Sequence, residues 1–555
     1  MIISRLRLGR APAVLTGVCA FVALWLGGVE RAVAEERCER IPALFQKWDA
    51  EDSPGGAVAV VKDGRIACLY GFGSADLAHR VPNTPDTRFT SASISKAFTA
   101  YAVAKLVDDG EIDLDAPISS YLKDVSHTIG ALTTRQLVAH TSGVRDELFL
   151  LRMAGRRRGD TVEREEVSRV LHAQEALNFP SGARWAYSNG GYALLANIVE
   201  AVTDTRFPDW TKEHIFERHG LGHTHFSGYG DVVLPNLARS YLPDETGAYH
   251  LRVLNDDDPG PTGLTTSVRD LAKWMLVLMD DKAELSGALE QFSTPAALSN
   301  GTPVKHFGFG HFLMNFRNVK GVGHGGRYSG HFNIYPEQNV GVAVLVNDAS
   351  ILPYQRLLRV ADLFLDTSQQ GKNDGFGVDQ QTCGPAVDLP LAAGVYTTTP
   401  LRNIVNVRRR NGVPVFNWWG YETAIQACDG GYFAPGLAFE AFYTEGQTAK
   451  IRLGGLAIER RDPAVVSQEV YEKAVGRYYN SSLNTSYTLA MARGDFILRQ
   501  DGQPDVVLFP LADDLFAATA PRFETLAFEA DGDGRVSALL VSALNSQNVR
   551  FRRID

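Results

Sequence analysis

Ser93-Ile94-Ser95-Lys96 opens a segment with apolar residues at helical spacing that continues to Val107 and ends at Gly110. Residues three apart lie on one helix face, so the Lys96 ammonium can reach the Ser93 hydroxyl. A serine hydroxyl becomes a nucleophile when a base takes its proton, and burial can lower the pKa of a lysine enough for that task. The helix start adds N–H groups where an oxyanion would form. The four residues alone are weak evidence, because a capping serine followed by a solvated lysine gives the same pattern.

A second candidate piece is Tyr187-Ser188-Asn189, in a loop marked by Pro180 and Gly182 that precedes a helix expected near Gly191. A phenolate at Tyr187 would be a credible general base and acid if Lys96 lay close enough to favour it. We expect Asn189 to hold a substrate amide. The alternative is that Tyr187 only packs between its apolar neighbours.

A third piece, His324-Gly325-Gly326-Arg327, leads into a strand near the end of the first domain. Glycines here would let a substrate backbone lie against the strand, and the Arg327 N–H would be a second oxyanion donor. We therefore expect His324, Gly326 and Arg327 to contribute to substrate binding. An ordinary loop histidine is the alternative.

Together the three motifs resemble the serine β-lactamase and penicillin-binding-protein superfamily, in its class C-like branch. Leu137–Val144 and Gly263–Thr266 resemble further signatures of the branch, and the resemblance covers about residues 40–365. It implies Ser93 as the acylated nucleophile, Lys96 as its activating partner and Tyr187 as base and leaving-group acid. It also implies that the site is lined by Asn189, His324 and Gly326.

One departure from the family pattern bears on the substrate. The third motif of β-lactamases and carboxypeptidases usually begins with lysine, whereas here it begins with His324, as in D-aminopeptidases and several esterases of the branch. A neutral imidazole loses most of the attraction for a substrate carboxylate at pH 7. Arg327 could restore a cation at this place.

The order of elements predicts an α+β fold for residues 35–365. Asp63-Gly64 predicts a hairpin between Ala57–Val61 and Ile66–Gly71, and helical patterns dominate from Ser93 to about Met279. Strand patterns return at Phe307–Phe312, Asn333–Tyr335 and Val340–Val346. Both ends of the domain would then complete one antiparallel sheet beside a helical region. Arg40–Ala50 is predicted to be a short amphipathic helix.

The tail differs in character and repeats itself. Asp366–Asp388 is predicted to be a linker, and short alternating strands follow in two units, residues 389–463 and 468–555. Gly394-Val395-Tyr396 is echoed by Gly476-Arg477-Tyr478, and Ile458–Arg461 by Phe551–Arg553. Each unit is predicted to be a small antiparallel β-barrel, which leaves no open sheet edge. This arrangement resembles the D-aminopeptidases, in which a barrel loop shapes the substrate pocket; a purely stabilising tail is the alternative.

Residues 1–34 predict export. Arginines precede an apolar run from Ala11 to Gly28, and Ala32-Val33-Ala34 offers a cleavage site, which is typical of a signal peptide. An uncleaved N-terminal anchor is the alternative. We expect a periplasmic or secreted protein with no membrane span in the mature chain. The net charge of −9 and the lack of a concentrated basic surface argue against a nucleic-acid partner.

Four cysteines follow the predicted signal: Cys38, Cys68, Cys383 and Cys428. Disulfides persist in an oxidising compartment, and the local pairs 38–68 and 383–428 are one of three possible pairings. No spacing of a zinc site occurs, and His223-Thr224-His225 is interpreted as a surface turn. We predict no metal and no cofactor, and the sequence leaves the oligomeric state open.

The leading hypothesis is an exported serine peptidase that forms an acyl-enzyme. Its substrates would be short peptides or amides with D- or other non-standard residues, including linear forms of cyclic peptide toxins, since the resembled family includes a peptidase of linearised microcystin. The first alternative is an esterase, β-lactamase or D,D-peptidase of the same family. The second is a non-catalytic penicillin-binding or sensor protein.

Overall fold

The computed structural model describes residues 35–366 and 393–555, except residues 158, 161, 228–231, 245, 253–257, 281–284, 286, 328, 399–403, 411, 419–420, 425, 429–430, 434–451, 454–455, 462, 521 and 545. The predicted signal peptide, the predicted linker beyond Asp366 and Cys383 lie outside these residues. In the described part, no helix combines the length and apolar character that crossing a membrane requires.

The first domain is built on a six-stranded antiparallel sheet of order β12-β13-β14-β15-β1-β2. Its strands are β1 Gly56–Lys62, β2 Arg65–Phe72, β12 Phe312–Phe316, β13 Val319–Gly326, β14 Gly330–Tyr335 and β15 Val340–Val346. The predicted hairpin is confirmed: Asp63 and Gly64 have φ of 50° and 75° between β1 and β2. Pairing of β1 with β15 confirms that both ends of the domain complete the sheet. The strand predicted at Phe307–Phe312 is wrong, since β12 begins at Phe312.

Each strand divides its side chains between two hydrophobic cores, one on each face of the sheet. In β1, Ala57, Ala59 and Val61 join the core beneath the helical region, whereas Val58 and Val60 join the core on the opposite face. Successive strand residues point to opposite faces, so the continuous apolar run Ala57–Val61 fits a sheet covered on both sides. The two faces are called here the helical face and the rear face.

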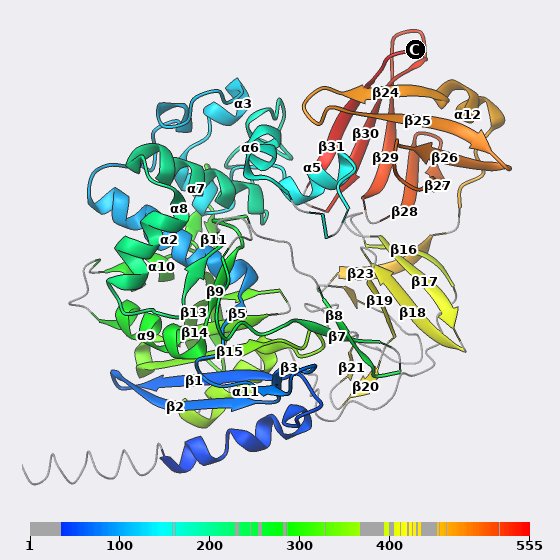
Figure 1. The fold of residues 1–555 in the computed structure, drawn as a ribbon. Coiled ribbons are helices and arrows are strands. Elements are labelled where there is room, and N and C mark those ends of the chain that lie inside the picture. Colours follow the sequence, from blue (N-terminus) through cyan, green and yellow to red (C-terminus); the bar gives the residue numbers. More distant parts are fainter. Residues whose placement is uncertain are drawn as a thin grey trace, which may run out of the picture.

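The helical face is covered by the segment between β2 and β12, which Figure 1 shows above the sheet. The helix α2 (Ser95–Asp108) runs through its centre, and most of its residues are buried. The other helical elements are η3 Ala92–Ile94, η4 Ile118–Ser120, α3 His127–Gly130, α4 Thr134–Val138, α5 Glu147–Met153, α6 Arg164–His172, α7 Asn189–Thr203, α8 Phe207–Thr211, the π-helical η5 Lys212–Glu217, α9 Val268–Met279 and α10 Ala288–Ser293.

Short strands connect these helices. The three-stranded sheet β5-β9-β6 lies beside the start of α2, because β9 contacts η3. The short strands are β3 Ser74–Asp76, β4 Val81–Pro82, β5 Phe89–Thr90, β6 His225–Phe226, β7 Tyr241–Pro243, β8 Tyr249–Leu251, β9 Leu264–Thr266, β10 Ala296–Ala297 and β11 Pro303–Val304.

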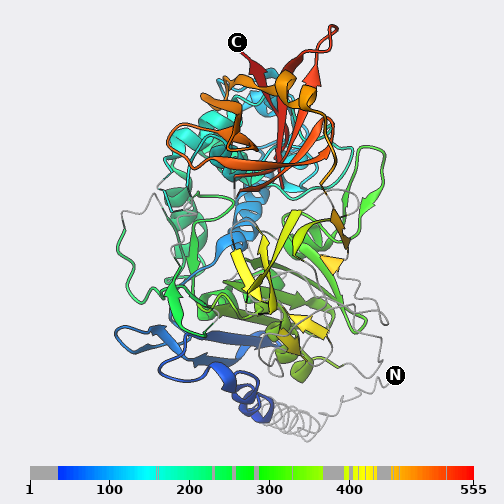
Figure 2. The same ribbon diagram turned by 90° about the vertical axis from the view of Figure 1, so that its right-hand side faces the viewer.

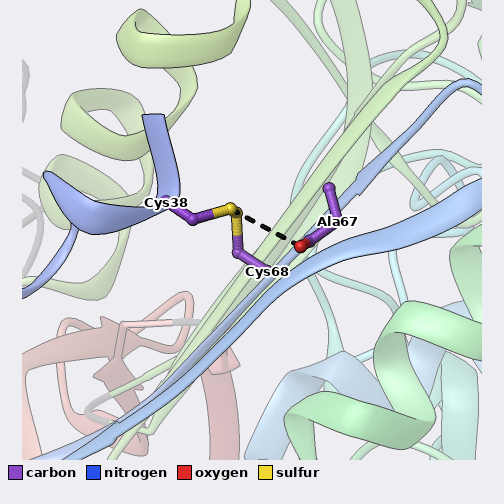
Figure 3. Close-up of a disulfide and its surroundings, with 3 residues drawn as sticks. All are labelled: Cys38, Ala67 and Cys68. Atoms are coloured by element: carbon purple, nitrogen blue, oxygen red, sulfur yellow. Dashed lines mark hydrogen bonds between the residues drawn. A yellow bond between two sulfur atoms is a disulfide. The ribbon is translucent and has the colours of Figure 1, made fainter. Parts of the chain in front are cut away.

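The rear face is covered by α11 (Pro353–Phe364), which follows β15 and the turn η6 (Pro336–Gln338), and by the N-terminal segment. The helix predicted over Arg40–Ala50 is wrong: the structure has two single 3₁₀ turns, η1 (Pro42–Leu44) and η2 (Gln46–Trp48). The predicted pair Cys38–Cys68 is confirmed as a disulfide with a Cα–Cα distance of 5.7 Å, and it ties this segment to β2. Figure 3 shows the bond, with Cys38 Sγ 3.5 Å from the Ala67 carbonyl oxygen.

The first tail unit contains a six-stranded antiparallel sheet of order β19-β18-β17-β16-β23-β22. Its strands, with the separate pair β20–β21, are β16 Gly394–Thr398, β17 Ile404–Arg410, β18 Val413–Trp418, β19 Tyr421–Ala424, β20 Gln426–Cys428, β21 Gly431–Phe433, β22 Arg452–Leu453 and β23 Leu456–Arg461. The barrel predicted for this unit includes residues 434–451, which lie outside the described part. The described residues form a sheet, and the barrel stays a prediction.

The second tail unit is a closed antiparallel barrel of eight strands, which confirms the prediction for this unit. It begins with α12 Gln468–Ala474 and continues with β24 Gly476–Asn480, β25 Thr485–Ala492, β26 Asp495–Arg499, β27 Val506–Ala512, β28 Leu515–Ala520, β29 Phe523–Ala530, β30 Val536–Ala543 and β31 Ser546–Arg553. Pairing of β24 with β31 closes the barrel.

The sequence repeat has a structural counterpart in the two units. In each unit the first strand pairs with the last full strand, Tyr396 opposite Arg460 and Tyr478 opposite Arg553. A Cβ at Gly394 would lie 3.0 Å from the Arg460 side chain, and one at Gly476 would lie 2.9 Å from the Arg553 side chain. The same small residue therefore faces the same arginine in both units, as a duplication would leave it.

The barrel packs against the helical region of the first domain. Figures 1 and 2 show it at the end of the molecule where α5 and α6 lie, far from β1 and β2. Apolar residues of the first domain and of the barrel belong to one continuous core, and α5 contacts β29. The Tyr487 hydroxyl donates to the Met153 carbonyl oxygen at 2.7 Å across this interface.

Candidate active site

The sequence-predicted nucleophile lies in a tight turn at the start of α2. Ser93 is in the 3₁₀ turn η3, and the α-helix itself begins at Ser95. Ala92 precedes it with φ of 44°, a left-handed conformation that costs a non-glycine residue about 1 kcal/mol. Ser95 fixes the turn, because its hydroxyl donates to Ala92 O at 2.5 Å and accepts the Leu264 N–H at 3.1 Å. Ser93 is half-buried, so its hydroxyl is held at the surface of a rigid turn.

Lys96 is fully buried directly beneath Ser93. Its Nζ donates to Ser93 Oγ at 3.2 Å, to Asn189 Oδ1 at 2.7 Å and to the Pro261 carbonyl oxygen at 2.7 Å. An ammonium has three N–H groups, so these acceptors match the charged form of the side chain. The two predicted partners of the Ser-x-x-Lys motif are therefore in direct contact.

Tyr187 lies on the same side of Lys96 as the nucleophile. Its ring centroid is 4.8 Å from Lys96 Nζ, and its hydroxyl is hydrogen-bonded to the Ser93 side chain. Burial raises the pKa of Tyr187 above its usual value; the Ser93 bond lowers it by less than burial raises it, and the Asp146 and Glu147 carboxyls each add a smaller rise. A resting phenolate at Tyr187 is thus disfavoured, and the phenol carries its proton.

The Tyr187 ring is held by a set of aromatic neighbours. His140, in the predicted signature Leu137–Val144, lies against it with ring centroids 4.4 Å apart and ring planes tilted by 36°, and Phe312 stacks on it at 6.3 Å. His140 Nδ1 accepts the Ser188 N–H at 3.2 Å, which also fixes the loop. Burial and the Lys96 charge lower the pKa of His140 well below its usual value, so this ring is a neutral support.

Asn189 is the first residue of α7, which begins two residues earlier than expected because the Ser188 hydroxyl caps it by accepting the Gly191 N–H. Asn189 was predicted to hold a substrate amide. The structure shows its Oδ1 engaged by Lys96, a contact that the sequence did not suggest.

The third motif lies along β13, at the edge of the same site. His324 is buried, with ring centroids 6.4 Å from Tyr187 and 5.1 Å from Phe312. Its Nδ1 lies 2.9 Å from Gly325 O, and among the described residues its buried Nε2 has no partner. Burial and the Lys96 charge lower the pKa of His324 well below its usual value, so the ring is neutral at pH 7.

Gly326 and Arg327 follow at the end of the strand. A Cβ at Gly326 would lie 2.1 Å from Ser91 O, so only glycine lets β13 approach the nucleophile turn this closely. Arg327 is half-buried in the turn between β13 and β14. The structure therefore brings together Ser93, Lys96, Tyr187, Asn189 and His324. Gly326 lets β13 pack closely against the turn that holds Ser93.

Two contributors were missed by the sequence analysis. The Pro261 carbonyl comes from the segment before β9, held against α2 because the Thr99 hydroxyl donates to Gly260 O at 2.8 Å. Asp146 is fully buried, and its Oδ2 accepts the Asn189 N–H at 3.1 Å. The available signal was its place just before the apolar start of α5, where an N-cap aspartate is common.

The described residues contain no group of three or more side chains suited to hold a metal ion. Of the pair considered in the sequence analysis, His223 has its Nδ1 3.8 Å from carboxylate oxygens of Asp86 and Asp270, and His225 lies in β6.

Comparison with known proteins identifies the family. The family model described as Beta-lactamase matches residues 42–365, more than half of the chain. The chain belongs to the Beta-lactamase family. The predictions of a β-lactamase-like fold and of a serine hydrolase are confirmed at this level.

Individual relatives of this Beta-lactamase family member agree with the predicted likeness to D-aminopeptidases. The chain is similar to the D-aminopeptidase of Brucella ovis, with 28% identity over 280 residues, 50% of this chain and 52% of that protein. It is equally similar to the D-aminopeptidase of Brucella anthropi, with 28% identity over 277 residues and the same coverage. The chain thus spans about half the length of the curated relatives it matches.

Among solved structures, the fold resembles the octameric penicillin-binding protein homologue from Pyrococcus abyssi. The match has a TM-score of 0.52 and 20% identity, and it covers 89% of this chain and 98% of the other. At this identity the likeness concerns the fold alone.

Proposed function

We propose that this protein is a serine peptidase of D-aminopeptidase type, which cleaves the amide bond of short peptides or amides with an N-terminal D-residue through an acyl-enzyme at Ser93. The observation that carries the proposal is the contact of the buried Lys96 Nζ with Ser93 Oγ at 3.2 Å. The similarity to D-aminopeptidases over half of their length supports the substrate class.

The first step requires a base for the Ser93 proton. When Lys96 is an ammonium and Tyr187 a phenol, the pair cannot accept the Ser93 proton. The pair therefore loses one proton before the reaction, and this singly deprotonated form is the base. Ser93 Oγ then bonds to the substrate carbonyl carbon while its proton passes to the pair. With that proton Lys96 is again the ammonium, which Asn189 Oδ1 and Pro261 O stabilise by accepting from Nζ.

The second half of the reaction returns the proton. The phenol of Tyr187, hydrogen-bonded to Ser93, protonates the leaving amine as the carbonyl–nitrogen bond breaks, and Lys96 restores the phenol. Water then attacks the acyl carbon and the same pair takes its proton. The bond from the acyl carbon to Ser93 Oγ breaks, and the pair gives that proton to Oγ, which restores the hydroxyl. No further co-reactant is required.

The neutral His324 supports the choice among activities of the family. A lysine in its place would attract a substrate carboxylate, and His324 carries no charge at pH 7 because burial and Lys96 lower its pKa. The His324 ring lies beside Phe312 and Tyr187, and its Nε2 atom is buried. We propose that Nε2 forms a hydrogen bond to the substrate. These properties disfavour β-lactams and D,D-peptides, whose carboxylate needs a cation.

The test is a panel of chromogenic substrates at equal enzyme concentration. It contains D-alanine p-nitroanilide, its L-isomer, N-acetyl-D-alanine p-nitroanilide, p-nitrophenyl butyrate and a chromogenic cephalosporin, with Ser93→Ala as control. We expect the free-amine D-anilide to give the highest kcat/KM of the three anilides, and Ser93→Ala to turn over none. Hydrolysis of the ester alone would show an esterase and overturn the peptidase proposal. A second arm, linear peptides derived from cyclic toxins analysed by mass spectrometry, tests the finer substrate class.

Export is part of the same proposal. The Cys38–Cys68 disulfide supports an oxidising compartment, as does the predicted signal peptide over residues 1–34. The mature protein is expected in the periplasmic or secreted fraction with Glu35 as its first residue, measured by intact mass. A cytoplasmic chain that still begins at Met1 would contradict this part.

A further inference from the structure

Asp146 lies behind the catalytic groups, between them and the barrel. Its Oδ1 accepts the Leu148 N–H at 3.1 Å and caps α5, while its Oδ2 accepts the Asn189 N–H at 3.1 Å. Asn189 Oδ1 in turn accepts from Lys96 Nζ at 2.7 Å. One buried carboxylate therefore sets the start of α5 and the residue that holds the lysine.

The barrel contacts this same point through the first residues of β31. The Ser546 hydroxyl donates to Asp146 O at 3.0 Å in a buried position, and Asn178 Oδ1 accepts the Gln547 N–H at 2.7 Å. Arg145 donates from Nε to Gln547 O at 3.0 Å and from Nη2 to Asn548 O at 3.1 Å. The backbone on which Asp146 stands is thus fixed by residues about 400 positions away in the chain.

The charges around Asp146 fit a structural counter-charge for the lysine. Its own burial raises the pKa of Asp146, while the N–H groups of Asn189 and Leu148 and the charges of Lys96 and Arg152 oppose that rise. Burial and the neighbouring Asp146 raise the pKa of Glu147 well above its usual value. Of the adjacent pair, Asp146 is the one whose carboxylate oxygens accept the Leu148 and Asn189 N–H groups, which favour its charged form.

We propose that Asp146 is a positioning residue for Asn189 and Lys96, and that the first residues of β31 of the barrel hold it in place. The barrel then acts on the rate of reaction from behind the lysine. The inference rests on the proposed function, in which Lys96 activates Ser93. Reacting groups displaced by about 1 Å lose about 100-fold in rate, so a loosened Asn189 has a measurable effect.

The first variant separates the two contacts of Asp146. In Asp146→Ser the shorter side chain can still cap α5 but cannot reach the Asn189 N–H. We expect kcat to fall about 10- to 100-fold with KM changed less than about 3-fold. The matched control is Ser126→Ala, which removes a cap of α3 at 3.2 Å and a hydrogen bond to Gln174 O at 2.6 Å, while Ser126 itself contacts neither Asp146 nor the catalytic side chains. It should lose stability without losing kcat, and equal losses of kcat in both variants would overturn the proposal.

The second pair of variants tests the barrel and remains informative if Asp146→Ser does not fold. Ser546→Ala removes the hydroxyl that donates to Asp146 O, and Ser482→Ala removes another barrel hydroxyl that donates to a carbonyl of the first domain, Ala173 O, also at 3.0 Å. We expect kcat to fall about 3- to 10-fold only in Ser546→Ala. The same kcat in both variants would overturn the role of the barrel.

The failures of the two proposals can be told apart by labelling Ser93 with a fluorophosphonate before the kinetics. A wild-type protein labelled at Ser93, with normal kcat in Asp146→Ser and Ser546→Ala, overturns this inference alone. Absence of label at Ser93 in the folded wild type overturns the proposed function and this inference with it.

Discussion

The two faces of the sheet in the first domain are built from the same strands and carry different tasks. On the helical face, small residues such as Ala57, Ala59 and Ala343 lie on β1 and β15, where α9 packs, and α2 contacts the neighbouring β13. The residues of the candidate site belong to this side or its rim. On the rear face, Val58, Val60 and larger side chains pack against α11 and the disulfide-linked N-terminal segment. Because successive side chains of a strand point to opposite faces, the catalytic side chains and the side chains that only stabilise the fold lie on different faces of the sheet.

The difference predicts that a change of equal size affects the rate on one face and only the stability on the other. The comparison is made most directly by substituting Lys96, which is buried on the helical face, and Cys68, which is buried on the rear face. The predictions below go from the largest expected effect on rate to the smallest.

The largest effect is expected for Lys96→Met. Methionine keeps most of the side-chain volume but removes the group that contacts Ser93 Oγ, so kcat/KM should fall about 10²- to 10⁴-fold, the usual contribution of an acid–base group. The control is Lys105→Met on the same helix, where the lysine pairs with Asp109 at 3.0 Å near the surface. Steady-state kinetics of both folded variants decide the point, and comparable activity of Lys96→Met and Lys105→Met would contradict the assignment.

A smaller effect is expected from pH. The Lys96–Tyr187 pair must lose one proton to accept that of Ser93, so kcat/KM should rise with pH on the acid side. It should fall only when the phenol ionises, and this limb lies above the usual tyrosine value because burial raises the pKa of Tyr187. The neighbouring His324 and His140 add no limb between about pH 7 and 8, since their pKa values lie well below the usual 6.5. A flat profile from about pH 5 to 10 would contradict the coupled pair.

The smallest effect on rate is expected on the rear face. Replacing both Cys38 and Cys68 by serine opens a loop with a sequence separation of 30 residues, which should lower the free energy of unfolding by about 2–4 kcal/mol. The value of kcat should stay within about 2-fold, because the disulfide lies on the face opposite the site. Thermal unfolding and kinetics, with oxidised wild-type protein as the reference and reduced wild type as a control, measure both. If the double serine variant lost as much kcat as Lys96→Met, the proposal that the two faces have different roles would be contradicted.

Local patterns carried the correct sequence predictions. The spacing of Ser93 and Lys96 on one helix, the Asp63-Gly64 turn and the repeated glycines Gly394 and Gly476 each depend on neighbours in the chain, and the structure has them as predicted. In the segment predicted as an amphipathic helix, Arg40–Ala50, the structure buries Ile41, Phe45 and Trp48. Their predicted conformation was wrong, because helical spacing does not distinguish one α-helix from two 3₁₀ turns that pack on the sheet.

Contacts between distant segments could not be predicted. Pro261 O is 165 positions from Lys96, and a backbone carbonyl leaves no mark in the sequence. Asp146 had the pattern of an ordinary helix cap, and only the fold brings its second oxygen to Asn189 and its carbonyl to Ser546. The chemistry of the candidate site is therefore encoded in short motifs, whereas the position of its groups depends on packing across the whole chain.

The most direct test of the central claim is the mass of the peptide that contains Ser93 after reaction with an acylating substrate. The protein is mixed with a D-alanine ester, quenched in acid and digested, and the peptides are sequenced by mass spectrometry. The account predicts a D-alanyl increment on Ser93 in the wild type and none in Ser93→Ala. An increment on another residue, or turnover of the ester by Ser93→Ala at the wild-type rate, would contradict it.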